Sequence, residues 1–216
     1  MSANTGPVQL DWIARWQRVA RRIRVPLGFL TAVLYLFELW RQAPRPAAIA
    51  WSLALVLPGI GLRACASGYV KKNSELTVTG PYAHTRNPLY LGSMLIAAGF
   101  AVAIESWAIG LVLAVGFALI YIPVIASEER FLRATFPGFA RYCALVPRLI
   151  PRITPARMGN GAAPGAQQSA PGSKGSFSIQ LYLRHREYNA ALGAALLYAS
   201  LLFLRPVVET ILRGAR

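Results

Sequence analysis

Charged residues are scarce in this sequence. Only 14% of its 216 residues are charged, whereas 55% are hydrophobic, and the mean hydropathy is +0.43. Soluble domains carry about 25% charged residues, so this composition argues against an ordinary soluble fold. It favours several membrane-spanning helices, each of which needs about 20 apolar residues to cross a hydrocarbon core roughly 30 Å thick.

Acidic residues are the scarcest of the charged residues. Eight Asp and Glu stand against 23 Lys and Arg, and the formal net charge is +15. In a soluble protein this excess would suggest nucleic-acid binding, but the sequence has no aromatic-basic nucleic-acid module. The basic residues lie between apolar runs, which indicates orientation in a membrane and contact with anionic lipid headgroups. We therefore expect a membrane partner and no nucleic-acid partner.

Cysteine and histidine are almost absent. The two cysteines are Cys65 and Cys143, and the two histidines are His84 and His185. Their separations fit neither a disulfide framework nor a metal-binding motif. We therefore expect no metal cofactor.

The apolar residues fall into five runs. We expect membrane-spanning helices at residues 25–40, 47–66, 88–104, 107–127 and 188–204. Ahead of them, segment 1–24 places Trp and Ile at helical spacing and Arg on the remaining positions, which predicts an amphipathic helix in the membrane interface. A basic stub that only sets the topology is the alternative. The expected fold class is thus an all-α integral membrane protein, with about five transmembrane helices and an N-terminal amphipathic interfacial helix.

The order of these segments predicts the domain organisation. The interfacial helix (1–24) is followed by two spans (25–66), a core (67–153), a linker (154–177) and a C-terminal span (178–216). The core contains a helical hairpin turned at Glu105-Ser106. The linker is rich in Gly, Ala, Pro, Ser and Gln, a composition that is typical of flexible segments.

The distribution of basic residues predicts the orientation. With the N-terminus in the cytoplasm and five alternating spans, the cytoplasmic segments 15–24, 63–86 and 130–186 hold 18 of the 23 Lys and Arg residues. The positive-inside rule favours this arrangement. The first apolar run follows a long basic segment, which does not resemble a cleavable signal peptide. We therefore expect a bacterial inner-membrane protein with a cytoplasmic N-terminus.

Two polar stretches lie at the two ends of the predicted hairpin, Gly80–Gly92 and Ser127–Arg130. Because a hairpin brings its ends to the same side, Arg86 and the pair Glu128-Glu129 should become neighbours. A cation just before a helix N-terminus is disfavoured by the helix dipole, so Arg86 suggests a nearby anion. Two carboxylates at the end of a spanning helix are costly unless partnered.

Plainer interpretations of these residues stay open. Asn87 and Pro88 are typical of a helix start, with Asn as the N-cap and Pro at the first helical position. Glu129 and Arg133, four residues apart, are spaced for a surface ion pair on one helix. Arg63, near the end of the second span, is placed either to reach the lipid headgroups or to enter a polar site.

Four blocks of sequence resemble the integral-membrane methyltransferase family, which includes isoprenylcysteine carboxyl methyltransferase and the phospholipid N-methyltransferases. In chain order they are GPYAHTRNPLYLG (80–92), EERFL (128–132), FPGFARY (136–142) and VPRLIP (146–151). The resemblance covers about residues 60–152. The chain departs from the isoprenylcysteine enzymes at Asn87, where they usually have His, and at the inserted proline of the third block.

The resemblance implies S-adenosylmethionine as cofactor, bound at the cytoplasmic face, and a lipid or other lipophilic acceptor that enters from the bilayer. It implies that the cofactor site includes Tyr82, Arg86, Asn87, Tyr90, Gly92, Glu128 and Glu129. Of these, we expect catalytic roles for two. Arg86 would hold an anionic group of cofactor or acceptor, and Glu129 would accept a proton if the acceptor is an amine.

Two other functions are compatible with parts of the sequence. A membrane reductase of the sterol-reductase type has a distantly similar C-terminal core but uses NADPH, and no extra basic cluster selects a 2′-phosphate here. A non-enzymatic membrane adaptor would bind no cofactor and would tolerate the loss of Arg86. The Glu128-Glu129 pair suits a cofactor that carries positive charge, which favours the methyltransferase.

Overall fold

The described residues of the chain are helical. A computed structural model describes residues 26–27, 29–70, 75–157 and 176–214. Its elements are α2 (Pro46–Tyr69), η1 (Gly80–Ala83), α3 (Pro88–Ile104), α4 (Trp107–Thr135), α5 (Phe139–Leu145), α6 (Ile179–Arg184) and α7 (Tyr188–Gly214), and residues 29–41 also form a helix. These residues contain no strand, which confirms the all-α fold class. The predicted interfacial helix at 1–24 lies outside the described residues.

The prediction of five membrane-spanning helices is supported only in part. Among the described residues, α2 and α4 are long and apolar enough to cross a membrane. The apolar helix α3 has 17 residues, and the apolar part of α7 ends at Leu204, so both fall short of the usual span length. Large apolar side chains nevertheless face outward along the bundle, with Trp40 and Trp107 each 82% exposed. Extensive exposed apolar surface of this kind indicates membrane association.

Helices α3 and α4 form the predicted hairpin. Glu105 closes α3 in the left-handed conformation, with φ 56°, and Ser106 caps α4 by accepting a hydrogen bond from the backbone N–H of Ile109. The turn therefore lies where the sequence predicted it. Helix α4, however, runs to Thr135 rather than ending near residue 127. As a result, Glu128 and Glu129 lie within the helix instead of just after it.

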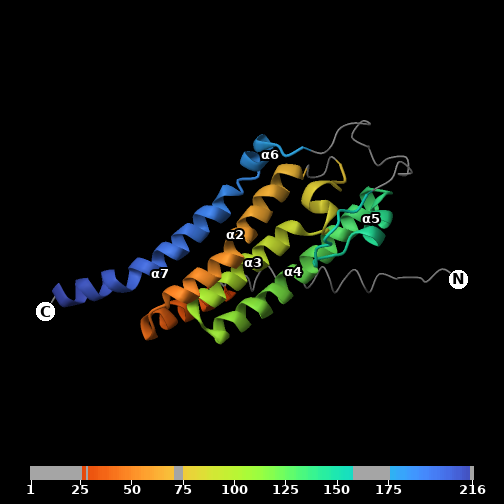
Figure 1. Ribbon diagram of the computed structural model, residues 1–216. Helices are drawn as coiled ribbons and strands as arrows, with labels where there is room; N and C mark the ends of the chain where they lie inside the picture. Colours follow the sequence, from red (N-terminus) through yellow and green to blue (C-terminus); the bar gives the residue numbers. More distant parts are fainter. Residues whose placement is uncertain (1–25, 28, 71–74, 158–175, 215–216) are drawn as a thin grey trace.

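The hairpin sets the arrangement of the bundle. Helices α2, α3, α4 and α7 run lengthwise, and η1 and α5 gather at the end where α3 begins and α4 finishes (Figure 1). At the opposite end, the buried carboxylate of Glu38 accepts a hydrogen bond from Ser106 and pairs with Arg41 at 2.9 Å. Arg45 pairs with Glu105 at the same end. These contacts hold the hairpin turn against residues 38–45. The two polar motifs lie at the other end of the bundle.

Helices α2 and α3 approach closely because glycines line their contact. A Cβ added at Gly59 would meet the carbonyl oxygen of Gly92 at 2.8 Å, and one added at Gly92 would meet that of Gly59 at 2.7 Å. A Cβ at Gly99 would meet Val56 at 2.4 Å. Small residues that permit such backbone approach are typical of membrane helix pairs. The contact fixes the start of α3, and hence the first polar motif, against α2.

We expect Gly92→Ala to destabilise the protein by about 1–3 kcal/mol, because the new methyl group meets backbone that cannot move aside. Thermal unfolding followed by circular dichroism in detergent would measure the change. Gly61→Ala is the matched control, since a Cβ there meets nothing within 4 Å. It should leave the stability unchanged or raise it slightly. Equal stability of the two variants would contradict this account of the contact between the helices.

Candidate functional site

A cavity of about 450 Å³ opens at the end of the bundle where α3 begins and α4 finishes. Both polar motifs reach it. Its lining includes Arg63, Tyr82, Arg86, Asn87, Tyr90, Tyr121, Glu128 and Glu129. Its volume is typical of small-ligand sites. We call it the polar cavity.

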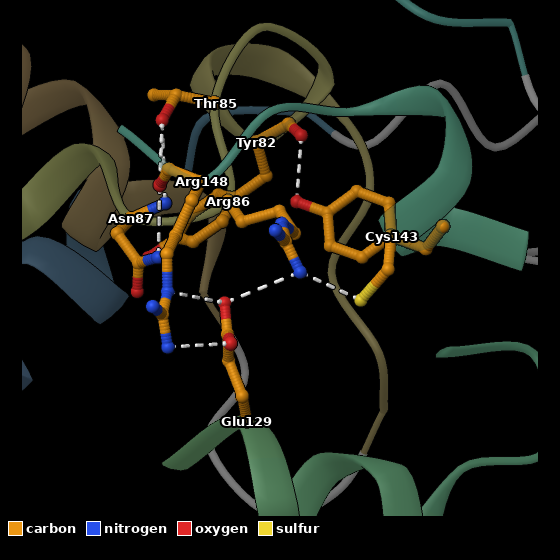
Figure 2. A network of polar contacts seen from close by, with 8 residues as sticks. Tyr82, Thr85, Arg86, Asn87, Glu129, Cys143 and Arg148 are labelled. Atoms are coloured by element: carbon orange, nitrogen blue, oxygen red, sulfur yellow. Dashed lines mark hydrogen bonds and ion pairs between the residues drawn. The ribbon is translucent and has the colours of Figure 1, made fainter. Parts of the chain in front are cut away.

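Glu129 is the centre of the charged side chains at this cavity. Its carboxylate lies 3.2 Å from Nη1 of Arg86 and 2.9 Å from Nη2 of Arg148 (Figure 2). The predicted proximity of Arg86 and the Glu pair is therefore correct. The alternative pairing of Glu129 with Arg133 does not occur in the structure. Two guanidiniums therefore share this one carboxylate.

Arg86 has a buried side-chain donor that lacks a hydrogen-bond partner among the described residues. Its Nη1 also donates to the Sγ atom of Cys143, whereas its Nε is buried and has no hydrogen-bond partner among the described residues. The Arg86 side chain is only 15% exposed. A buried donor left without a partner costs free energy. The Nε–H of Arg86 is therefore an unsatisfied donor in a side chain that lines the polar cavity.

The segment after α5 holds the first motif in place. The backbone N–H of Arg86 donates to the carbonyl of Pro147, and that of Arg152 donates to the carbonyl of His84, each at 2.9 Å. The Asn87 side chain donates to the carbonyl of Arg148 at 2.9 Å. Asn87 occupies the N-cap position of α3, as predicted, although its side chain makes no capping hydrogen bond there. Pro88 does occupy the first turn of α3, as predicted.

Tyr82 and Tyr142 form the buried wall beside this segment. The Tyr142 hydroxyl donates to the backbone carbonyl of Tyr82 at 2.8 Å. Burial raises the pKa of both phenols well above that of free tyrosine, and the nearby Glu128 adds to the rise in the pKa of Tyr82. Both phenols therefore stay neutral at physiological pH and add no negative charge to the cavity.

Glu128 has a different environment from Glu129. Its Oε1 accepts a hydrogen bond from the Tyr90 hydroxyl at 2.8 Å, and its side chain is exposed at the mouth of the cavity. The Tyr90 ring meets Tyr121 edge-on, with centroids 5.1 Å apart, and Tyr121 stacks on Phe117 at 4.4 Å. A cation bound here can be attracted both by the carboxylate of Glu128 and by the faces of the aromatic rings.

Arg63 belongs to the same site, although the sequence motifs do not include it. It donates to Ser93 on α3 and to Glu187 beside the start of α7, the latter at 2.7 Å. Its Nε is buried and has no partner among the described residues. In the sequence, the only signal for this role is an arginine near the end of an apolar run. That signal is equally compatible with contact with lipid headgroups and with a place in a polar site.

A second, apolar cavity of about 670 Å³ adjoins the first. It runs between the first helix, α3, α4 and α7, and its lining includes Leu27, Phe100, Leu113, Phe117, Gly193 and Leu197. Arg63, Ser93 and Tyr121 line both cavities. These three side chains therefore form the boundary between the polar cavity and the apolar one. We call the second space the apolar cavity.

The structure places six of the seven predicted site residues in the lining of the polar cavity. They are Tyr82, Arg86, Asn87, Tyr90, Glu128 and Glu129. The seventh residue, Gly92, lies on α3, as Tyr90 does, but it faces α2 and packs against Gly59 and Arg63. Its position indicates a packing role, through which it fixes the backbone that bears Tyr90 and Asn87.

Comparison with known families supports the resemblance. Residues 59–138 match the phospholipid methyltransferase family. That segment comprises the C-terminal part of α2, the first motif, the hairpin and both glutamates. The match thus confirms, over this segment, the family relationship that the motifs indicate, and it supports a membrane methyltransferase.

Two known proteins are similar to part of this chain. The cobalt-zinc-cadmium resistance protein CzcN of Cupriavidus metallidurans is 43% identical over 84 residues, and the nickel-cobalt-cadmium resistance protein NccN of Alcaligenes xylosoxydans xylosoxydans is 38% identical over 84 residues. Each alignment covers 39% of this chain and 39% of the relative. No solved structure matches the chain significantly. Within the described residues, no three His, Cys, Asp or Glu side chains gather in a way that could hold a metal ion.

Proposed function

We propose that the protein is an S-adenosylmethionine-dependent methyltransferase that acts on a lipid or lipophilic acceptor at the cytoplasmic face of a membrane. The observation that supports this most strongly is the polar cavity. It brings the arginine of one motif and the two glutamates of the other together, next to an apolar cavity with which it shares three lining residues. The family match over residues 59–138 supports the same reaction class.

The residues of the polar cavity suit the chemistry of this cofactor. S-adenosylmethionine has a carboxylate, an ammonium, a sulfonium, ribose hydroxyls and an adenine ring. The unpartnered Nε–H of Arg86 suits the carboxylate. Glu128, whose described hydrogen bond comes from the neutral Tyr90 hydroxyl, suits the ammonium or the ribose. The rings of Tyr90 and Tyr121 suit the adenine or the sulfonium.

The cofactor, when bound, supplies an electrophilic methyl group for direct displacement by the acceptor. The protein then needs mainly to position the reactants and exclude water. Arg86 is fixed for that task because Glu129 holds it from one side and the backbone of Pro147 from the other. Glu129 in turn is fixed by Arg148. This rigidity is what positioning catalysis requires.

The contacts of the two glutamates favour a different assignment of the proton acceptor from the one that the sequence suggests. An amine acceptor needs a base, for which Glu129 is the candidate from the sequence. Both oxygens of Glu129 already contact guanidiniums, Oε1 that of Arg86 and Oε2 that of Arg148. Glu128 has no arginine partner among its described contacts. We therefore assign proton acceptance to Glu128 if the acceptor is an amine, and the positioning of Arg86 to Glu129.

The acceptor would lie across the boundary of the two cavities. Its lipophilic part suits the apolar cavity, and its reacting group suits the polar end, where Arg63 and Ser93 lie. A phospholipid amine and an isoprenylcysteine-like carboxylate both have this shape. The excess of basic residues in segments 63–86 and 130–186 supports a cytoplasmic site in a bacterial inner membrane.

Titration calorimetry of the detergent-solubilised protein tests this function. We expect S-adenosylhomocysteine to bind with a one-to-one stoichiometry and NADPH to give no heat. Transfer of a labelled methyl group from S-adenosylmethionine into a bacterial lipid extract would then identify the acceptor class. Binding of NADPH without S-adenosylhomocysteine would replace the methyltransferase with a reductase. Binding of neither, in protein reconstituted with lipid, would reject both.

A further inference from the structure

The C-terminal helix α7 forms one wall of the apolar cavity, although it lies far beyond the segment that matches the family, which ends at residue 138. Its residues Ala190, Gly193, Ala194 and Leu197 line that cavity together with residues of α3 and α4. The space next to the proposed reaction centre is therefore shaped by a part of the chain outside the family segment. The side chains on this wall set the shape of the space, and that shape can determine which acceptor fits.

Helix α7 is held firmly against the bundle. The Tyr198 hydroxyl bonds to that of Ser52 on α2 at 2.6 Å, and its ring packs on Phe100 with centroids 5.0 Å apart. Ala194 is only 4% exposed and belongs to the main core cluster. Just ahead of the helix, Glu187 pairs with Arg63 at the polar end of the cavity. The wall is thus built on fixed contacts at both ends of the cavity.

Gly193 is the position where this wall has no side chain. A Cβ added there would meet no atom within 4 Å. Its neighbour Ala194 is buried in the core, whereas Gly193 itself is exposed and lines the cavity. Glycine in a helix interior costs roughly 1 kcal/mol relative to alanine, and no close contact explains it here. The missing side chain keeps that part of the cavity open.

We propose that α7 is a specificity-determining element of the acceptor site, and that Gly193 leaves room for the hydrocarbon chain of the acceptor. The inference rests on the proposed function, because it takes the apolar cavity as the continuation of the reaction site. The occupant is one hydrocarbon chain, whose polar end reaches Arg63, Ser93 and Tyr121 at the boundary with the polar cavity. A side chain at position 193 would occupy the space that the chain needs.

Photolabelling tests the inference without relying on turnover. The probe is a lysophosphatidylethanolamine whose oleoyl chain bears a diazirine near its methyl end, added to the full-length protein in nanodiscs. We expect labelled peptides to include Leu113 and Leu197, which line the cavity. In Gly193→Leu this labelling should fall about tenfold, a typical effect of filling a hydrophobic pocket. Unlabelled decanoyl, myristoyl and oleoyl analogues, added as competitors, then measure the chain preference.

The matched control is Gly61→Leu. Gly61 also has nothing within 4 Å of its added Cβ, but it lies on α2 and lines neither cavity. Its labelling should equal that of the wild type, and both variants should bind S-adenosylhomocysteine as the wild type does. That binding also shows that the variants fold.

Two results would overturn the inference. One is unchanged labelling of the cavity in Gly193→Leu. The other is labelling confined to outward-facing residues such as Trp51 and Leu196, which are 73% and 71% exposed. Failure of the wild type to bind S-adenosylhomocysteine would instead count against the proposed function, and the labelling pattern would still show whether α7 borders a site for a hydrocarbon chain.

Discussion

Replacing Glu129 with alanine is expected to weaken the binding of S-adenosylhomocysteine by about a hundredfold, or roughly 2.7 kcal/mol. Glu129 is the anion that holds both Arg86 and Arg148, at 3.2 and 2.9 Å. Without it, the guanidinium of Arg86, which lines the cavity, has no anionic partner among its described contacts and loses its position. Truncating one partner of a largely buried charge pair typically costs 2–5 kcal/mol. Calorimetric titration in detergent measures the change.

The control for Glu129→Ala is Glu105→Ala. This substitution also removes a carboxylate from an arginine pair, but at the opposite end of the bundle, where Glu105 contacts Arg45. It should leave the affinity for S-adenosylhomocysteine unchanged. Circular dichroism should show that both variants keep their helices. An unaltered affinity in folded Glu129→Ala would remove Glu129 from the cofactor site.

The meeting of Arg86 and Glu129 could be predicted from sequence because it follows from the hairpin. Two apolar runs separated by Glu105-Ser106 must return to the side from which they started, so their outer ends come together. The structure bears this out, with Ser106 capping α4 as a short polar residue at a helix start does. The lining of one cavity also contains six of the seven site residues that the family resemblance implies.

The partners of individual side chains could not be predicted in this way. Asn87 has the sequence context of an N-cap, yet its side chain bonds to the carbonyl of Arg148, 61 residues further along the chain. Glu129 has Arg133 one helical turn away but pairs with Arg86 and Arg148. Both choices depend on the path of the segment after α5, which packs beside the first motif through backbone hydrogen bonds. Local spacing contains no information about that path.

The role of the C-terminal helix α7 could not be predicted from the sequence for a related reason. The apolar run at 188–204 predicts a further span, but it leaves open how that span relates to the site. In the structure, Glu187 reaches Arg63 across 124 residues of sequence and Tyr198 reaches Ser52 across 146. These pairs place α7 beside α2 and close the apolar cavity. Contacts between helices that are remote in sequence depend on packing geometry, which hydropathy alone does not describe.

Replacing Arg86 with lysine is expected to lower kcat/KM for methyl transfer by about a hundredfold to a thousandfold, the usual effect of removing one preorganised donor. Lysine keeps the positive charge and can keep an ion pair with Glu129. It lacks the Nε–H, which in Arg86 is buried and without a partner among the described residues. It also lacks the planar fork that binds a carboxylate through two donors. The expected loss therefore measures the donor geometry rather than the charge.

The pattern of the loss in Arg86→Lys identifies which anion the arginine holds. If Arg86 binds the carboxylate of the cofactor, the affinity for S-adenosylhomocysteine falls with kcat/KM. If it binds an anionic group of the acceptor, that affinity stays and the KM for the acceptor rises. Arg45→Lys, at the far end of the bundle, makes the same change in a pair with Glu105 and should alter neither quantity. Full activity in Arg86→Lys would mean that charge alone suffices, and that the spare donor at Nε contacts no reactant.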